Sequence, residues 1–144
     1  MVGKDFDTLN LENEPGFLLY AASKETIRRC NPLLATLDLT YTQYITLLVL
    51  WDQPNISVKA LGDMLYLDSG TMTPVLKKLE AKGYITRTRS TLDERSVCIG
   101  LTEDGIALKE QVETLQPGGY FPLKAKETAQ LNTLLRKLLA ALQK

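Results

Sequence analysis

The sequence contains no histidine and only two cysteines in 144 residues. Without histidine the chain cannot form a Ser-His-Asp or Cys-His nucleophile pair, or a zinc site with histidine ligands. Cys30 and Cys98 lack the spacing of a metal-binding motif, and in a reducing cytosol we expect both to remain thiols. No isolated pair of carboxylates stands out either. We therefore expect a protein that is not an enzyme and needs no metal or cofactor.

Long apolar segments are also absent. Apolar runs such as LLVLW at residues 47–51 are far shorter than the roughly 20 residues that cross a bilayer as a helix. The first ten residues, MVGKDFDTLN, are polar and have no apolar signal-peptide core. The length and the 24% of charged residues are typical of one ordered globular domain. We expect a single-domain cytoplasmic protein.

The formal net charge is zero, but its distribution is uneven. Residues 1–68 carry a net charge of −4, whereas residues 69–101 carry +3. A basic segment within a neutral protein favours an anionic partner for one face, and nucleic acid fits that description. On charge alone, an ordinary solvated surface explains the pattern equally well.

The apolar periodicity predicts helices in the first third of the chain. One is expected over residues 17–37, with Asn13 as its N-cap and a kink at Pro32. The segment TYTQYITLLVLWD, residues 40–52, opens with Thr and Gln in capping-box spacing. Because it is apolar on nearly all sides, we expect a buried helix.

Residues 57–83 predict two short helices joined by a tight turn. Ser57 can cap the first, Asp68 or Ser69 the second, and Gly83 is a natural stop. The segments YITRTR and SVCIGL then alternate as strands do, around the polar turn STLDER. A helix-turn-helix followed by a basic hairpin is a winged helix. The expected fold class is mainly α with a small β-hairpin wing.

The C-terminal part predicts two more helices. Thr102 can cap the first, QPGG at residues 116–119 interrupts the pattern, and the last helix is expected over residues 123–143. Its leucines repeat on one stripe, which is more apolar than a solitary C-terminal helix needs. Dimerisation is the economical explanation. Packing back onto the first helix is the alternative, and both can hold together.

The second helix of the motif and the wing are expected to expose hydroxyl and cationic side chains. Hydroxyls near a helix N-terminus can donate to phosphates or base edges, and lysines neutralise phosphate. An arginine at a hairpin tip can enter a narrow minor groove, where a nearby aspartate can orient it. Each residue alone is more commonly solvated surface, but their joint placement favours duplex DNA. The predicted contacts are Ser69, Thr71, Thr73, Lys77, Lys78, Arg87, Arg89, Asp93 and Arg95.

Residues 65–105 resemble the DNA-binding lobe of MarR-type transcriptional regulators. The resemblance rests on TPVLKKLE and on DERS followed by LTEDG. The upstream segments LENEPGFLLYAASKE and LTYTQYITLLVLW are similar to the OhrR/SarZ branch of thiol-based organic-peroxide sensors. The resemblance implies a homodimer held by dimerisation helices at residues 13–52 and 103–144, with a winged-helix DNA-binding segment at residues 56–101. It also implies a palindromic operator read in successive major grooves.

The sensing residues depart from this branch. Its sensor cysteine corresponds to Gly16, and Cys30 stands where a pocket tyrosine is expected, while Tyr20, Tyr41 and Tyr44 match. Along one helix, Gly16 and Cys30 are about 21 Å apart and cannot touch. The resemblance implies that antiparallel pairing of two first helices brings these positions together between subunits.

Three interpretations of Cys30 are open. It is a buried space-filling residue, a relocated redox switch near Arg28 and Arg29, or the sign that redox sensing gave way to a small-ligand pocket. Cys98 is expected to be structural.

For the whole chain we expect a homodimeric DNA-binding regulator, a repressor, that responds to an organic hydroperoxide or a small organic ligand. The rival functions are a winged helix that binds protein and has no operator, and a thiol peroxidase.

Overall fold

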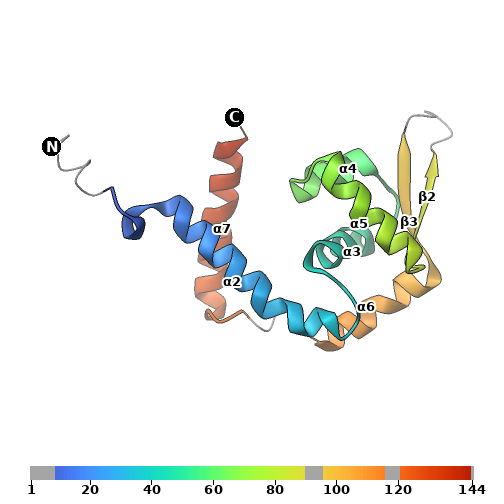
Figure 1. The fold of residues 1–144 in the computed structure, drawn as a ribbon, viewed down its shortest axis with the longest axis horizontal. Coiled ribbons are helices and arrows are strands. Elements are labelled where there is room, and N and C mark those ends of the chain that lie inside the picture. The colour runs from blue at the N-terminus through green and yellow to red at the C-terminus, as the bar shows by residue number, and fades with distance from the viewer. Residues whose placement is uncertain (1–8, 90–95, 116–120, 144) are drawn as a thin grey trace.

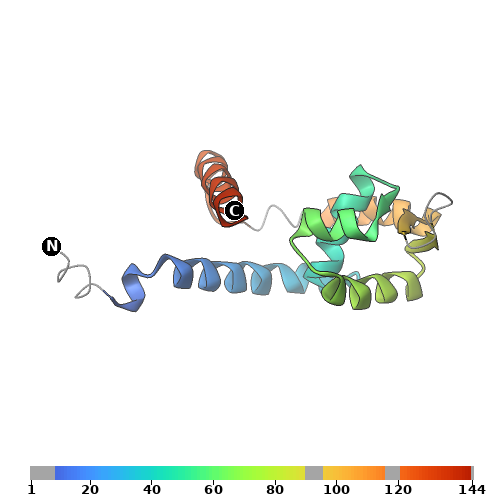
Figure 2. The same ribbon diagram turned by 90° about the horizontal axis from the view of Figure 1, so that it is seen from above.

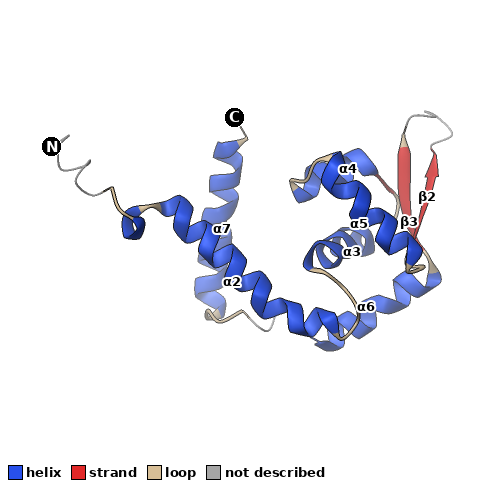
Figure 3. Cartoon of the chain, in the orientation of Figure 1, coloured by secondary structure: helices blue, strands red, loops and turns tan. Residues whose placement is uncertain are grey.

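The computed structural model describes residues 9–89, 96–115 and 121–143 (Figures 1 and 3). Most of these residues are helical, and a small antiparallel sheet accompanies the helices, which confirms the predicted fold class. In the part of the chain so described, no helix is long and apolar enough to span a membrane. The elements are η1 (Leu11–Asn13), α2 (Pro15–Ala35), α3 (Tyr41–Asp52), β1 (Ile56–Ser57), α4 (Val58–Leu65), α5 (Ser69–Ala81), β2 (Ile85–Arg89), β3 (Val97–Leu101), α6 (Glu103–Leu115) and α7 (Ala125–Leu142).

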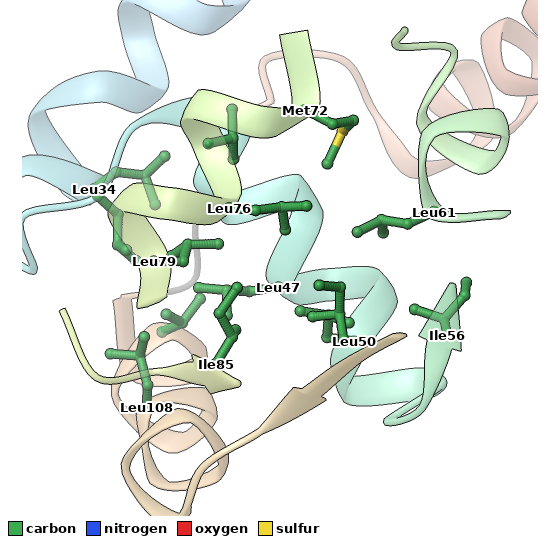
Figure 4. Close-up of a cluster of buried hydrophobic side chains, with 14 of the residues drawn as sticks. Leu34, Leu47, Leu50, Ile56, Leu61, Met72, Leu76, Leu79, Ile85 and Leu108 are labelled. Carbon is green, nitrogen blue, oxygen red and sulfur yellow. The ribbon is translucent and has the colours of Figure 1, made fainter. Parts of the chain in front are cut away.

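The elements from α3 to α6 form a packed lobe, which we call the winged lobe. Helices α3, α4 and α5 enclose its core with the sheet, and α6 contributes Leu108 (Figure 4). Val112 of α6 also belongs to this core. The apolar run of α3 supplies Leu47 and Leu50, which are fully buried, whereas Leu48 is 44% exposed, so the expected burial holds for one side of the helix only. In the sheet, β3 lies between β1 and β2 and runs antiparallel to both. The strand β1 was not predicted, since its two residues are too few for an alternating pattern.

The helix ends in the winged lobe follow the capping signals of the sequence. Thr40 and Gln43 form a capping box at the start of α3, Ser57 caps α4 and Asp68 caps α5. Gly83 follows α5 with a φ of 84°, where glycine is favoured. These local hydrogen bonds therefore set the boundaries of both helices of the motif.

The turn between α4 and α5 is tight. A Cβ at Gly62 would lie 2.7 Å from the backbone oxygen of Leu67, so only glycine fits there without a shift. Tyr66 ends α4 in the left-handed region, with a φ of 57°. Because of this turn, α5 begins soon after α4 ends, and its start is held close to α4.

The first helix begins differently from the prediction. Glu14, not Asn13, is the N-cap of α2, because its carboxylate accepts the backbone N–H of Gly16 at 2.8 Å. Asn13 instead ends the short helix η1. Pro32 lies inside α2, which continues to Ala35.

Two helical segments extend away from the winged lobe (Figures 1 and 2). We call residues 11–29 and α7 the arms. Helix α7 has no buried residue, and in α2 only Cys30 and Leu34 are buried. Within one chain, Leu131 and Leu135 of the C-terminal leucine stripe are partly covered, whereas Leu134, Leu138, Leu139 and Leu142 are exposed. Packing back onto the first helix, the alternative left open by the sequence, therefore leaves most of the stripe uncovered. The large exposed apolar side chains of the arms are Leu11, Leu18, Leu19, Tyr20, Leu134, Leu138, Leu139 and Leu142.

Candidate nucleic-acid interface and sensing pocket

Helix α5 has one buried face and one exposed face. Its inward side chains belong to the core of the winged lobe, where Met72, Leu76 and Leu79 have at most 1% of their surface exposed. The opposite face carries the five α5 positions that the sequence predicts as DNA contacts. All five are exposed, namely Ser69, Thr71, Thr73, Lys77 and Lys78.

The start of α5 is fixed by its own polar groups. The carboxylate of Asp68 accepts the backbone N–H of Thr71 at 2.8 Å. Hydrogen bonds from the backbone and the side chain of Thr71 lower the pKa of Asp68, so this carboxyl is ionised at neutral pH. The hydroxyl of Thr73 donates to the backbone oxygen of Ser69 at 2.8 Å. Two of the predicted hydroxyl contacts therefore also hold the first turns of the helix.

The charge on this face changes along the helix. A negative Asp68 disfavours phosphate at the first turn, whereas Lys77 and Lys78 lie about two and a half turns further on. The lysines are thus suited to the phosphate backbone, and the first two turns, which carry small side chains, are suited to base edges.

Two residues of this face escaped the sequence analysis. Gly70 and Pro74 are exposed and lie four residues apart, with Lys77 three residues further on, so the three share the outward side of α5. A Cβ at Gly70 would meet only the Asp68 carboxylate, at 3.5 Å, so the surface there is open. Neither residue carries a charged or hydroxyl group, so neither was predicted as a DNA contact, although the helical spacing places both on this face.

The wing is attached to α5 by an ion pair. Arg87 Nε lies 3.3 Å from Glu80 Oε1, and the side chain of Arg87 is only 31% exposed. Arg87 therefore links β2 to α5, the second helix of the motif and the predicted recognition helix. Arg89, at the end of β2, is exposed. The remaining predicted wing contacts, Asp93 and Arg95, lie outside the described residues.

An open groove of about 670 Å³ lies between α4, the start of α5 and the wing. Its walls carry both charges, with Lys59 and Arg87 on the basic side and Asp63 and Asp68 on the acidic side. Predicted DNA contacts Ser69 and Thr73 also line it. The groove is thus part of the same surface as the exposed face of α5.

The sensing residues fall into two separate groups. Cys30 is fully buried, and the rings of Tyr41 and Tyr44 meet edge to face with centroids 5.9 Å apart. Burial, and then the nearby Cys30, raise the pKa of both tyrosines. Gly16 and Tyr20 are instead exposed on the first turns of α2, away from this cluster. The chain alone therefore brings three of the five predicted residues together.

A second cavity, of about 410 Å³, lies beside the tyrosine cluster. Tyr41 is part of its wall, together with Thr40, Leu39 and the α2 residues Ile27 and Asn31. Cys30 is not among the lining residues, and none of its surface is exposed. We call this cavity the corner pocket, because it lies where α2 turns into α3. In the described parts of the chain, no three acidic or cysteine side chains are grouped as a metal site.

Comparisons with known proteins agree with this geometry. Residues 28–112 match the family described as transcriptional regulator SarA/Rot, which is more than half of the chain. The organic hydroperoxide resistance transcriptional regulator of Bacillus subtilis is 49% identical over 140 residues, covering 95% of each chain. The regulator SarZ of Staphylococcus saprophyticus is 43% identical over 128 residues, covering 88% of each chain.

Solved structures show the same fold with DNA bound. Reduced AbfR bound to DNA has a TM-score of 0.85 at 29% identity, covering 99% of this chain and 97% of that one, and AbfR is a protein of Staphylococcus epidermidis. A mutant of MarR from Escherichia coli, complexed with operator DNA, has a TM-score of 0.78 at 31% identity, covering 86% of this chain and 92% of that one. The chain belongs to the MarR-type winged-helix transcriptional regulators, in the branch of the organic hydroperoxide regulator and SarZ.

Proposed function

We propose that this chain is a homodimeric repressor that binds a palindromic operator through α5 and the wing. The observation that carries the proposal is the exposed face of α5, which holds small polar side chains at its start and two lysines further on. Neighbours of the same fold are solved with DNA bound. Because a repressor must reach the DNA, the proposed location is the cytoplasm. The proposed role is binding to DNA rather than catalysis.

The arms support the dimer. Leu134, Leu138 and Leu142 lie on one side of α7 and are at least 37% exposed in the single chain. Such a row of apolar side chains is typical of a surface that another chain covers. A two-fold axis would then set two α5 helices at the spacing of successive major grooves.

The input of the regulator is a small organic ligand in the corner pocket. Two observations favour this over oxidation of Cys30. The thiol has no exposed surface in the single chain, whereas the cavity next to Tyr41 is present and lined largely by apolar groups. Cys30 then fills space behind the tyrosines, as free cysteine commonly does in cores.

Salt dependence of DNA binding separates the regulator from a protein-binding winged helix. Affinity for promoter DNA should fall steeply as salt rises, because bound lysines release counterions from phosphate. Lys78→Gln should reduce the slope of log K against log salt by about one. Lys109→Gln, at an exposed position of α6, is the control and should leave the slope unchanged. No retardation of promoter DNA at low salt would exclude the regulator.

Mass spectrometry after mild organic hydroperoxide treatment tests the input, with operator binding measured in parallel. The native chain should keep Cys30 reduced and its DNA bound, and should not turn over the peroxide. Gly16→Cys is the matched variant, because a Cβ there meets only the end of the Glu14 side chain, at 3.0 Å. It should gain peroxide sensitivity. If peroxide instead releases DNA from the native chain but not from the Cys30→Ser variant, Cys30 is a relocated thiol switch.

A further inference from the structure

Lys82 joins the end of the recognition helix to the corner between α2 and α3. It is the C-cap residue of α5, and its side chain is only 24% exposed. Its ammonium donates to the backbone oxygen of Asp38 and, at 2.9 Å, to the side-chain oxygen of Gln43. The Asp38 carboxylate lies 3.6 Å away but is 94% exposed, so this ion pair contributes little. The backbone oxygen of Asp38 and the side chain of Gln43 therefore carry the attachment.

The corner that accepts Lys82 is itself tightly specified. Asp38 has a φ of 56°, a left-handed conformation that is uncommon outside glycine. Gln43 is 2% exposed, and its side-chain oxygen also accepts the backbone N–H of Thr40 at 3.2 Å. One oxygen thus serves both the capping box of α3 and Lys82. Any movement of Thr40 or Gln43 changes the position of the acceptor for Lys82.

The same corner forms one wall of the corner pocket. Leu39, Thr40 and Tyr41 line the cavity, and they lie between Asp38 and Gln43 in the sequence. Residues 38–43 therefore have two contacts: some of their side chains line the corner pocket, and the oxygens of Asp38 and Gln43 bind Lys82. A molecule that displaces this segment would alter the attachment of α5 without touching α5.

We propose that Lys82 is a positioning residue for operator recognition: it fixes the orientation of α5 against residues 38–43 and carries changes at the corner pocket to the recognition helix. The proposal rests on the proposed function. The two hydrogen bonds of Lys82 support it, because both acceptors belong to the segment of the pocket wall rather than to the DNA-facing surface. The lysine acts through α5 and not by contact with DNA.

The first test compares Lys82→Met, Lys82→Arg and Lys109→Met on an operator duplex selected by the native protein from random DNA. Methionine keeps the apolar stem but removes both charge-assisted hydrogen bonds, so operator affinity should fall about tenfold. Affinity for a scrambled duplex and the salt slope should stay as in the native chain. Arginine should restore most of the loss, and Lys109→Met should change nothing. A salt slope reduced by about one would mean that Lys82 binds phosphate, and would overturn the proposal.

The second test replaces the unidentified ligand with a wedge. Ala35 lines the corner pocket and is exposed, so Ala35→Phe fills part of the cavity at low cost to folding. It should weaken operator binding in the native background and have no further effect in Lys82→Met. Ala107→Phe, an exposed change on α6, is the control and should have no effect. Equal losses from the wedge in both backgrounds would contradict the coupling. A native chain without any salt-sensitive DNA binding would fail earlier, and would overturn the proposed function itself.

Discussion

The winged lobe and the arms differ in how their apolar residues are covered. In the lobe, Leu47, Leu50 and Leu61 have no exposed surface. In the arms, Leu134 and Leu142 are 64% and 66% exposed. Leucine recurs at helical spacing in both regions, so the sequence pattern alone does not distinguish them. The lobe completes its core within one chain, whereas the described residues leave the apolar side chains of the arms uncovered.

This difference suggests that the lobe determines folding of the single chain and that the arms determine assembly of the proposed dimer. The lobe holds the residues that we propose as DNA contacts, and its local caps and core fix their positions within one chain. In the proposed dimer, the arms determine the distance between the two lobes. Stability and operator binding should therefore respond differently to changes in the two regions.

The largest effect is expected from charges in the arms. Leu134→Glu with Leu138→Glu should dissociate the dimer, because each buried leucine contributes about 1.5–3 kcal/mol and the contact occurs in two copies. Operator affinity should fall by more than about a hundredfold as the two half-sites become independent. Analytical ultracentrifugation measures the dissociation. Asn132→Glu, an exposed polar position of α7, is the control, and a persisting dimer of the double variant would contradict the role of the arms.

A core truncation in the lobe should act on folding instead. Leu47→Ala should lower the free energy of unfolding by about 2–5 kcal/mol, because it leaves a cavity in a packed core. Leu134→Ala should weaken the dimer contact only, so its effect on the free energy of unfolding should depend on protein concentration. Urea unfolding at two protein concentrations distinguishes the two. An equal, concentration-independent loss in both variants would remove the distinction between lobe and arms.

Two glycines of the motif offer a matched pair. Gly62→Ala should cost about 1–3 kcal/mol of stability, because its Cβ would lie 2.7 Å from the Leu67 backbone oxygen. Gly70→Ala should leave stability unchanged or slightly higher, since the space around it is open. Thermal unfolding checks both. A stable Gly62→Ala variant would show that the turn between α4 and α5 is less constrained than its geometry indicates.

The smallest effect concerns the N-cap of α5. The pKa of Asp68 is lowered by its hydrogen bonds to Thr71, so its contribution to stability is present above the ordinary value of 3.8 and is lost as the pH falls through its folded value. Asp68→Asn keeps a capping acceptor but does not titrate. On acidification below about pH 4, the native chain should therefore lose slightly more stability than Asp68→Asn. Acid unfolding of both proteins, followed by circular dichroism, measures this difference. Coincident unfolding curves for the native chain and Asp68→Asn would contradict the contribution of the Asp68 cap.

Much of the lobe was predictable because its signals are local. The capping box of Thr40 and Gln43, the caps Ser57 and Asp68, and the stop at Gly83 each involve residues within a few positions. The start of α2 was predicted wrongly because adjacent Asn13 and Glu14 both carry side-chain acceptors, and only the backbone course decides between them.

The site was predictable in part for a related reason. Helical spacing identifies the exposed face of α5, but the outward Gly70 and Pro74 carry no charge to attract notice. The burial of Cys30 and the attachment of Lys82 to residues 38–43 depend on contacts between distant segments. No local pattern encodes such contacts, so they emerge only from the packed structure.

The most direct measurement is the affinity of the native chain for a selected palindromic duplex and for one isolated half of it, over a range of salt concentrations. The dimer model predicts a much higher affinity for the full duplex, and a log–log salt slope about twice that of the half-site. Equal affinities and equal slopes for the two duplexes would contradict recognition by a pair of α5 helices.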